Sequence, residues 1–554
     1  MHHRLRPPLA RALRRATLCA IAALGVAACS LGGKDSGDDT APSPAAGADW
    51  PVFGGVRDNT RFSSLDAIDK DNVAKLGVAW TQELSALQTM NENYPIMVGR
   101  TLYVTTNTGE VVAFDAATGR RRWKHAPKVD FSLSRGIGGF GVAVNRGVAV
   151  DDKQVYLLTF DNQLQALSRA TGEMLWSSRV ADPRTGAYQS MAPSVWNGLI
   201  YVGVSGAEDG IRGYVAAYDA RTGKQVWRFW TVPKPGEGWV PKGRHGGGTV
   251  YMPPTVDART GLVYAGTGSP SPTVDGSRRP GRNLYTSSIL ALDARTGKLR
   301  WYYQQTPHDV LNHDAASPVM LFDTVVRGRR VRAVAEASKN GYFYVLDART
   351  GRPLFPRVPF VKQKHVTLPR GKGVLACPGT IGGAQYAPAA YSPKTHAAYV
   401  TGMNICMTVK PSERGAVTGY RDFGGEATAD DDRKTGTVTS VDMRTGRVKW
   451  QKTLPWPVLG GATATAGGLV LVGDAHGILY AFDADNGSIL WRAALGLAHG
   501  SAPIVYSVDG TQYVAMSIGG SPLSANFGWG KVGSRVVVLK VGGTPVRPYK
   551  GPGA

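Results

Sequence analysis

The sequence predicts an all-β protein made of repeated blades, because one short pattern recurs along most of the chain. Its clearest copy, VAAYDARTGKQVW at residues 215–227, has an alternating apolar strand, an Asp, a Thr-Gly turn and a second strand that ends in an aromatic residue. Such a unit is a β-hairpin. Near-copies occur at residues 111–123, 164–176, 289–301, 343–355, 438–450 and 479–491.

The number and ends of these repeats predict an eight-bladed β-propeller. A lone hairpin is only marginally stable, so units that recur at roughly 40 to 50 residues must stack on one another as a propeller or a solenoid. The aromatic residues that end a strand are Trp80, Trp123, Trp176, Trp227, Trp301, Phe355, Trp450 and Trp491. Each is an apolar plate that can wedge between blades, and an indole N–H there can find a backbone acceptor.

The two ends of the chain are each half of a repeat. The strand 72–80 ends in a Trp but has no strand before it, whereas the strand 535–541 has no Trp after it. We therefore expect these two strands to complete one blade, which closes the ring and removes its open edges.

The composition fits one large, turn-rich domain. The chain has 554 residues, 70 of them Gly and 34 Pro, and a propeller can hold this length in one domain because its burial is spread over blades. The formal net charge is +23, but the basic residues are scattered through turns and form no recognition motif. We therefore expect no nucleic-acid partner, and instead some affinity for an anionic envelope surface.

The N-terminus has the layout of a secretory signal. Five arginines precede the apolar run LCAIAALGVAACS at residues 18–30, which is too short to span a membrane. The letters VAAC resemble a bacterial lipobox, which implies cleavage before Cys29 and lipidation of its thiol; an ordinary signal peptide that contains a Cys is the alternative. Ser30 follows instead of Asp, and by the lipoprotein pattern this favours a periplasm-facing position on the outer membrane.

These features divide the chain into four parts. We expect a signal peptide with lipobox at 1–29, a flexible tether rich in Gly, Ser, Asp and Pro at 30–48, the propeller at 49–543 and a C-terminal tail at 544–554.

The remaining cysteines point to a disulfide. Cys19 lies in the signal, which leaves Cys377 and Cys406 in the exported domain, and an oxidising compartment favours their pairing. No CxxCH motif occurs, so we expect no c-type haem in this sequence.

Several segments carry a family resemblance. They are residues 50–80, NRGVAV at 145–150, SGAEDGIRGYVAAYDA at 205–220, RRPGRNLYTSSILALD at 278–293, TPHD at 306–309 and KNGYFYVLD at 339–347. Together they resemble the quinoprotein alcohol dehydrogenases over roughly residues 49–541. The resemblance implies a propeller of that type that binds pyrroloquinoline quinone (PQQ) beside a calcium or lanthanide ion. It also implies an alcohol or aldehyde substrate and a separate electron acceptor.

The same resemblance assigns the cofactor contacts. They fall on Glu92, Arg146, Thr159, Ser205, Gly206, Ala207, Thr249, Tyr251, Lys339 and Gln385. The rigid guanidinium fork of Arg146 suits the carboxylates of the cofactor, and Lys339 would stand near the quinone oxygens. The alternative for each is an ordinary solvated turn residue.

The metal and catalytic positions depart from the family pattern. The metal candidates are Glu208, Ser269 and Asp314, where Ser269 replaces an Asn and offers a poorer ligand for a hard cation. The family's catalytic Asp aligns with Asn312, and an amide cannot act as the general base that is worth about 10²–10⁴ in rate. Asp314, which matches an extra carboxylate of the lanthanide-binding branch, and Lys339 are the other catalytic candidates.

Further departures affect the stacking groups. The family's adjacent Cys pair aligns with Phe140 and Gly141, and its stacking Trp aligns with Tyr251. A third Trp near the mouth aligns with Leu459, and a cofactor-side Asn aligns with Gln385.

Two functions remain open on the sequence alone. The first is a PQQ-dependent dehydrogenase tethered to the envelope by its lipid. The second is a non-catalytic propeller lipoprotein that acts as a binding or outer-membrane assembly scaffold, because a fold does not fix a function.

Overall fold

The computed structural model describes the part of the chain from residue 45 onward, with gaps. The described residues are 45–84, 90–133, 143–237, 240, 246–364, 373–412, 423–429, 434–547 and 549. The chain divides into two units, 1–41 and 42–554, and every described residue belongs to the second. The signal, Cys29, Phe140 and Gly141 lie outside the described residues.

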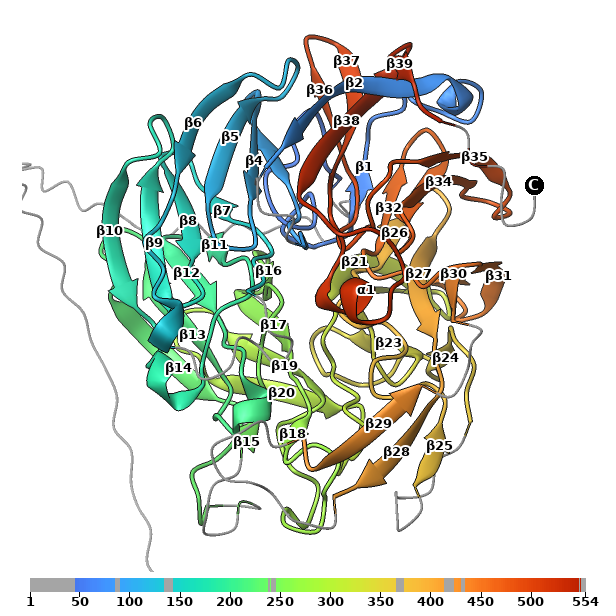
Figure 1. The fold of residues 1–554 in the computed structure, drawn as a ribbon. Helices are drawn as coiled ribbons and strands as arrows, with labels where there is room; N and C mark the ends of the chain where they lie inside the picture. The colour runs from blue at the N-terminus through green and yellow to red at the C-terminus, as the bar shows by residue number, and fades with distance from the viewer. Residues whose placement is uncertain are drawn as a thin grey trace, which may run out of the picture. The chain divides into compact units, whose positions relative to one another are not determined.

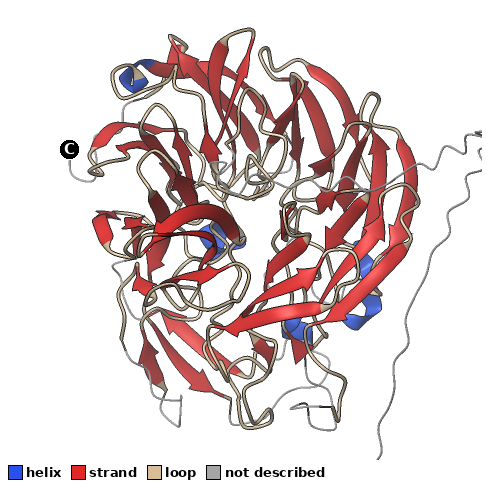
Figure 2. Ribbon diagram, turned by 180° about the vertical axis from the view of Figure 1, so that it is seen from behind, coloured by secondary structure: helices blue, strands red, loops and turns tan. Residues whose placement is uncertain are grey.

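Within the described residues, eight sheets of four or five strands surround a common centre (Figure 1), and the view from behind shows the same arrangement (Figure 2). The prediction of an eight-bladed propeller is confirmed. Blade one is β3 (Ile96–Val98), β4 (Thr101–Thr105), β5 (Val111–Asp115) and β6 (Arg121–His125); blade two is β7 (Ala149–Val150), β8 (Gln154–Leu158), β9 (Gln163–Ser168) and β10 (Met174–Arg179). Blade three is β11 (Ser194–Trp196), β12 (Leu199–Val202), β13 (Tyr214–Asp219) and β14 (Gln225–Trp230); blade four is β16 (Thr255–Asp257), β17 (Leu262–Gly266), β19 (Ser288–Asp293) and β20 (Leu299–Gln304).

The second half of the ring repeats this plan with additions. Blade five is β21 (Met320–Val326), β22 (Arg329–Ala337), β23 (Tyr342–Asp347) and β24 (Val358–Pro359); blade six is β26 (Ala390–Ser392), β27 (Ala397–Asn404), β30 (Thr435–Asp442) and β31 (Val448–Leu454). Blade seven is β1 (Phe62–Ser63), β32 (Ala462–Thr465), β33 (Leu469–Gly473), β34 (Ile478–Asp483) and β35 (Ile489–Ala494). Blade eight is β36 (Ile504–Val508), β37 (Thr511–Ile518), β38 (Arg535–Val541), β2 (Leu76–Glu83) and β39 (Thr544–Pro545).

Smaller elements decorate the loops. Two small sheets pair β15 (Gly246–Gly247) with β18 (Pro270–Ser271), and β28 (Met407–Pro411) with β25 (Val374–Ala376) and β29 (Gly425–Ala429). The helix α1 (Pro522–Asn526) lies in the loop between β37 and β38, near the centre of the ring in Figure 1. In the described part of the chain, no helix is long and apolar enough to cross a membrane.

The two ends of the chain meet in blade eight. Strand β2 pairs antiparallel with β38, with Trp80 opposite Val538, which confirms the predicted closure. Residues next to the predicted propeller also pack on it: Ala46 bridges to Ser63, and β39 adds a short strand beside β2. The ring therefore has no open seam between its first and last strands.

The aromatic residue that ends one blade docks on the hairpin turn of the next. The indole N–H of Trp227 in blade three donates to the Ala294 carbonyl of blade four at 2.9 Å. The expected backbone acceptor is likewise present for Trp80, Trp123, Trp301 and Trp450, at 2.9–3.2 Å, but the buried indole N–H of Trp176 has no partner, so the expectation is wrong there. Gly297 of the turn has φ +69°, and a Cβ there would lie 2.4 Å from the Trp227 ring. The Gly of each repeat is thus required by its neighbour's ring as well as by the turn.

Apolar side chains fill the spaces between neighbouring sheets. One cluster joins Tyr201, Val215 and Trp227 of blade three to Val263 and Leu290 of blade four, and all five are buried. Because the residues of a strand alternate between faces, each inner strand supplies apolar groups to both of its neighbours.

The predicted disulfide is present. Cys377 and Cys406 are joined, with their Cα atoms 4.4 Å apart. The bridge ties the residue that directly follows β25 to the residue that directly precedes β28.

We predict that Gly297→Ala lowers the free energy of unfolding more than Gly261→Ala does. Both residues have positive φ, +69° and +66°, so both substitutions cost about 1–2 kcal/mol of backbone strain. Only at Gly297 does the new Cβ overlap Trp227, and overpacking of this kind costs a further 1–3 kcal/mol or so. Urea unfolding of both variants measures the difference. Equal losses at the two positions would show that the docked ring contributes nothing.

Candidate active site

A cavity lies where the inner ends of the blades converge, with about 110 Å³ open to water-sized molecules. Its walls come mostly from the segments that lead into the innermost strands of blades one to six, and α1 of blade eight adds two residues. The lining residues are Glu92, Val144, Arg146, Tyr188, Ser190, Ser205, Gly206, Ala207, Glu208, Thr249, Tyr251, Ser269, Asn312, Asp314, Lys339, Ile381, Gln385, Tyr386, Pro522 and Leu523. Residues far apart in sequence thus meet because blades one to six each direct the loop before their innermost strand to the centre.

One side of the cavity holds a buried ion pair. Nη2 of Arg146 lies 2.5 Å from Oε2 of Glu92, and Glu92 is only 3% exposed. Burial raises the pKa of Glu92, and the charge of Arg146 opposes that rise. Nη1 of Arg146 also donates to Oγ of Ser190 at 3.0 Å, while the guanidinium lies 4.7 Å from the centre of the Tyr386 ring. The cation is therefore fixed in place by contacts from three blades.

The other side is organised around Asp314. Its Oδ2 accepts hydrogen bonds from the Tyr251 hydroxyl at 2.7 Å and from Nζ of Lys339 at 3.1 Å, and its Oδ1 accepts the Ser269 backbone N–H at 2.6 Å. Burial, then the charge of Asp314, raises the pKa of Tyr251, so this hydroxyl remains a donor. A carboxylate has about four lone-pair sites. Three of these sites accept the hydrogen bonds just described, which leaves one free lone pair, on Oδ1.

Oxygen groups that suit a hard cation lie beside Asp314. The Ser269 hydroxyl donates to Oδ1 of Asn312 at 2.9 Å, and the Asn312 amide donates to the Thr380 carbonyl at 3.3 Å. Glu208 lines the same cavity, and its charge also raises the pKa of Tyr251. Carboxylate, amide and hydroxyl oxygens are the ligands that calcium takes, although a full set needs six to eight. Among the described residues, no group of three or more His, Cys, Asp and Glu is placed to hold a metal.

A tight loop forms the edge of the cavity between these two sides. The Ser205 and Ser190 hydroxyls lie 2.8 Å apart, and Gly206 begins a single 3-10 turn over Ala207–Asp209. Gly206 has φ +114°, and a Cβ there would lie 2.4 Å from the Gly186 carbonyl oxygen. Only glycine allows this close approach of two chain segments.

The structure brings almost all of the predicted site residues together. Every predicted cofactor, metal and catalytic residue lines the cavity except Thr159. The Thr159 hydroxyl donates to Asp161 at 2.6 Å inside its own turn, so its bond is local. Leu459 is buried in an apolar cluster and does not line the cavity.

Other lining residues were not predicted. Tyr188, Ser190, Tyr386 and Leu523 reach the cavity from three different segments, since Tyr188 and Ser190 share one loop. The only sequence signal for any of them is that Tyr386 directly follows Gln385.

The lining fits a planar, anionic, polar cofactor. Nε of Arg146 and Oε1 of Gln385 are buried without a hydrogen-bond partner, so both can pair with a bound group. Arg146 and Lys339 supply fixed positive charge, while the rings of Tyr251 and Tyr386 supply flat apolar faces.

Comparisons with known proteins agree with this site. Residues 50–367 match the family model described as glucose/ethanol/alcohol dehydrogenase, beta-propeller domain, and residues 434–520 match the model of the outer membrane protein assembly factor BamB. The chain is 34% identical to a quinohemoprotein alcohol dehydrogenase of Comamonas testosteroni, over 87% of this chain and 74% of that protein. It is 33% identical to the dehydrogenase subunit of an alcohol dehydrogenase (quinone) of Gluconobacter oxydans (strain 621H), over 85% of this chain and 70% of that protein.

Solved structures show the same relationship. A quinohemoprotein alcohol dehydrogenase of Pseudomonas putida HK5 superposes with a TM-score of 0.82 at 31% identity, covering 92% of this chain and 82% of that one. A europium-containing methanol dehydrogenase superposes with a TM-score of 0.80 at 28% identity, covering 89% and 98%. The chain therefore belongs to the family of PQQ-dependent alcohol dehydrogenases.

We predict that Arg146→Met destabilises the protein by about 3–5 kcal/mol near pH 8, because it leaves Glu92 buried without its partner charge. Loss of the cation raises the folded-state pKa of Glu92 further above its ordinary value of 4.5. The loss of stability is therefore absent below pH 4.5 and grows as the pH rises above it. Above pH 4.5, Glu92 ionises in the unfolded chain but stays protonated in the folded one. Urea unfolding at pH 5 and pH 8 measures this trend.

The double variant Arg146→Met with Glu92→Gln is the matched control. The double variant lacks the titrating group, so its loss in free energy of unfolding should be the same at the two pH values. A single variant with an equal deficit at both pH values would contradict the ion-pair interpretation.

Proposed function

We propose that this chain is a PQQ-dependent dehydrogenase that oxidises an alcohol or aldehyde and passes the electrons to a separate acceptor. The observation that carries the proposal is the convergence of Asp314, Lys339 and Arg146 on one cavity. Two buried cations and a hydrogen-bonded carboxylate serve no purpose in a purely structural ring centre, because burying charge costs stability.

The cofactor would be held by the residues that already face the cavity. Arg146 and Lys339 would bind its negative oxygens, and Thr249, Ser205 and Gln385 would add neutral hydrogen bonds. When bound, PQQ supplies a quinone that accepts two electrons from the substrate.

The charges of the lining also favour a cation. Glu92, Glu208 and Asp314 outnumber Arg146 and Lys339, so the lining is net negative and would repel an anionic cofactor. A calcium or lanthanide ion held by Glu208, Ser269 and Asn312, close to the charge of Asp314, would reverse that sign. Binding of the cofactor and binding of the cation are thus coupled, and we expect PQQ and the metal to bind together.

The chain's own residues supply the proton chemistry. Asp314 keeps one lone pair on Oδ1, beside Asn312 and Ser269, and this oxygen is the candidate acceptor for the substrate's hydroxyl proton. Lys339 and Tyr251 hold the other oxygen and so fix the orientation of the carboxylate. Val144, Ile381 and Leu523 form apolar wall that excludes water and suits a carbon chain.

We predict that Asn312→Asp increases alcohol-dependent dye reduction by about tenfold or more, once the protein is reconstituted with PQQ and calcium or a lanthanide. Three of the four lone-pair sites of Asp314 are already hydrogen-bonded, and a second carboxylate at position 312 would add general-base catalysis worth up to 10²–10⁴ or so. Asp tolerates the positive φ of +60° that Asn312 adopts, and it retains an oxygen for the Ser269 hydroxyl.

Asp314→Asn is the companion variant and should abolish dye reduction. Equal inactivity of the parent and Asn312→Asp with PQQ bound would reject the enzymatic proposal. It would favour the second candidate, a binding or assembly scaffold, for which the match of residues 434–520 to the assembly-factor model is the specific observation.

We also propose that the protein is anchored in the outer membrane by a lipid on Cys29 and faces the periplasm. The small residues before Cys29 and the Ser that follows it support this placement. Mass spectrometry of the mature protein should find an N-terminal Cys29 that carries acyl chains, and Cys29→Ala should release the protein from membranes. A mature N-terminus further along the chain would instead indicate an ordinary signal peptide.

A further inference from the structure

The hairpin turns between the third and fourth strands of the blades lie at the end of the ring opposite the central cavity. In blade three, Asp219 at the start of this turn is opposite Leu199, the first residue of β12, and in blade four Asp293 is opposite Leu262, the first residue of β17. The turn between the first two strands of a blade therefore lies at the same end. The cavity residues instead precede the innermost strands, at the other end. We call the end that carries both sets of turns the turn face.

Basic side chains that are scattered along the sequence gather on the turn face. The hairpin turns of blades three to six hold eight exposed basic residues, which are Arg221, Lys224, Arg295, Lys298, Arg349, Arg352, Arg444 and Arg447. The turns between the first two strands of blades four, five and six add the exposed residues Arg259, Arg327 and Lys394. Four adjacent blades thus present positive charge on one side of the ring.

The acidic residues of these hairpin turns are fewer and bind their own turns. Each turn has one Asp at its first position, and the four are buried or half-buried: Asp219, Asp293, Asp347 and Asp442. Oδ1 of Asp293 accepts the backbone N–H groups of Arg295 and Thr296, at 3.1 and 3.0 Å, and the other three turns repeat this pattern. Of the eight basic residues, only Arg444 forms an ion pair with a described residue, Asp442. The turns of blades three to six are therefore net positive.

The N-terminal segment joins the ring on the same face. The Ser507 backbone N–H donates to the Ala48 carbonyl at 2.9 Å, and the Gly99 backbone N–H donates to Asp49 at 3.0 Å. Ser507 and Gly99 lie at the turns between the first two strands of blades eight and one. The chain before Ala48, which includes the expected tether, therefore attaches at the turn face.

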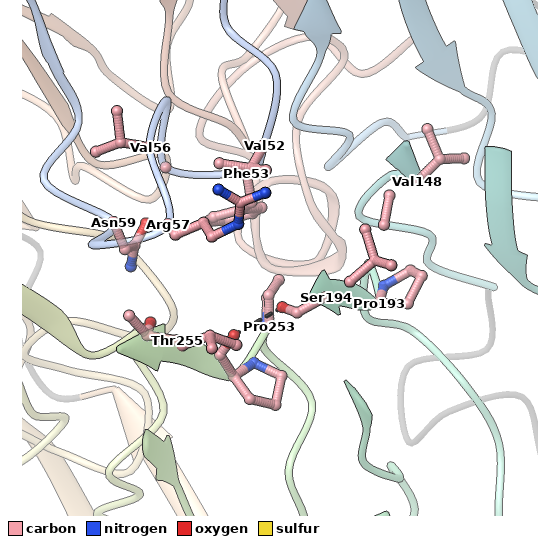
Figure 3. A pocket seen from close by; sticks show the side chains of 15 residues that line it. Val52, Phe53, Val56, Arg57, Asn59, Val148, Pro193, Ser194, Pro253 and Thr255 are labelled. Atoms are coloured by element: carbon pink, nitrogen blue, oxygen red, sulfur yellow. Dashed lines mark hydrogen bonds between the residues drawn. The ribbon is translucent and has the colours of Figure 1, made fainter. Parts of the chain in front are cut away.

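The segment that follows is packed against the ring, so this point of attachment is fixed. Trp50 is buried. Figure 3 shows Phe53 and Val56 on one side of a small apolar pocket, facing Val148 and Pro253 from the segments that lead into blades two and four.

We propose that the turn face binds an anionic phospholipid surface. Such a surface has a negative potential that attracts basic clusters, and each Lys or Arg close to it contributes about fivefold in affinity. At about 0.15 M salt the screening length is about 8 Å, so the charge orients a lipid-anchored ring but does not retain a free one. The attached chain leaves from the same face, and the central cavity then lies on the side away from the membrane. The contact itself does not depend on a lipid at Cys29.

Vesicle binding of residues 30–554, which contain every described strand and lack the lipid, tests the charge directly. At about 0.01 M salt, where the screening length is about 30 Å, this chain should co-sediment with phosphatidylcholine vesicles that contain about one third phosphatidylglycerol. It should not co-sediment with vesicles of phosphatidylcholine alone. At about 1 M salt, where the screening length falls to about 3 Å, binding to the anionic vesicles should be lost.

Two quadruple variants locate the contact. The turn-face variant removes four exposed charges from blades four and five: Arg295→Gln, Lys298→Gln, Arg349→Gln and Arg352→Gln. The control variant removes four exposed charges from loops at the cavity end of the strands: Lys128→Gln, Lys234→Gln, Lys362→Gln and Lys531→Gln. The first should weaken binding to anionic vesicles about tenfold or more, whereas the second should change it by less than about twofold.

The proposal is overturned if residues 30–554 do not bind anionic vesicles at low salt. It is also overturned if the two variants lose affinity equally, because overall charge and not the turn face would then be responsible. Binding to polyglutamate without binding to anionic vesicles would likewise reject it and would indicate an acidic protein partner. None of these results bears on the proposed dehydrogenase function, which is measured with PQQ and an alcohol.

Discussion

The docking of a blade's terminal aromatic ring on the turn of the next blade, present at seven of the eight blade boundaries, is the constraint on which the rest of the structure depends. The indole of Trp227 is held by the Ala294 carbonyl and packs where Gly297 has no side chain. Repeated around the ring and closed by the pairing of β2 with β38, this contact fixes the angle between neighbouring sheets. Because every blade is set the same way, the loops that precede the innermost strands all point to the centre.

The centre then has to accommodate charge in a place with little water. Arg146 with Glu92 and Lys339 with Asp314 form two opposed ion pairs, each buried. A buried pair gives little net stability, and removal of one partner is costly. The sequence therefore retains these groups at the expense of stability, which is the expected property of a binding site prepared for an anionic cofactor.

The fold was predictable because its signals are local. A hairpin, its Asp-x-x-Thr-Gly turn and its terminal Trp all lie within 13 residues, as in 215–227, so the repeat is visible without knowledge of any long-range contact. The half-repeats at the two ends predicted the closure for the same reason. The disulfide followed from the small number of cysteines outside the predicted signal.

The site was predictable only as far as family motifs extend. Arg146, Lys339 and the Ser205 loop lie in recognisable motifs, and the structure places them in the cavity. Ser190 and Tyr386 contact Arg146 from other blades, and such contacts leave no pattern in either local sequence. Thr159 does not line the cavity, and its hydroxyl donates to Asp161, two residues away.

A crystal structure of the protein grown with PQQ and either calcium or a lanthanide tests the central claim most directly. We predict PQQ in the cavity, with Arg146 and Lys339 on its oxygens and the cation in contact with Glu208 and Asn312. A cavity that stays empty at saturating PQQ, or PQQ bound outside it, would contradict the assignment of this site.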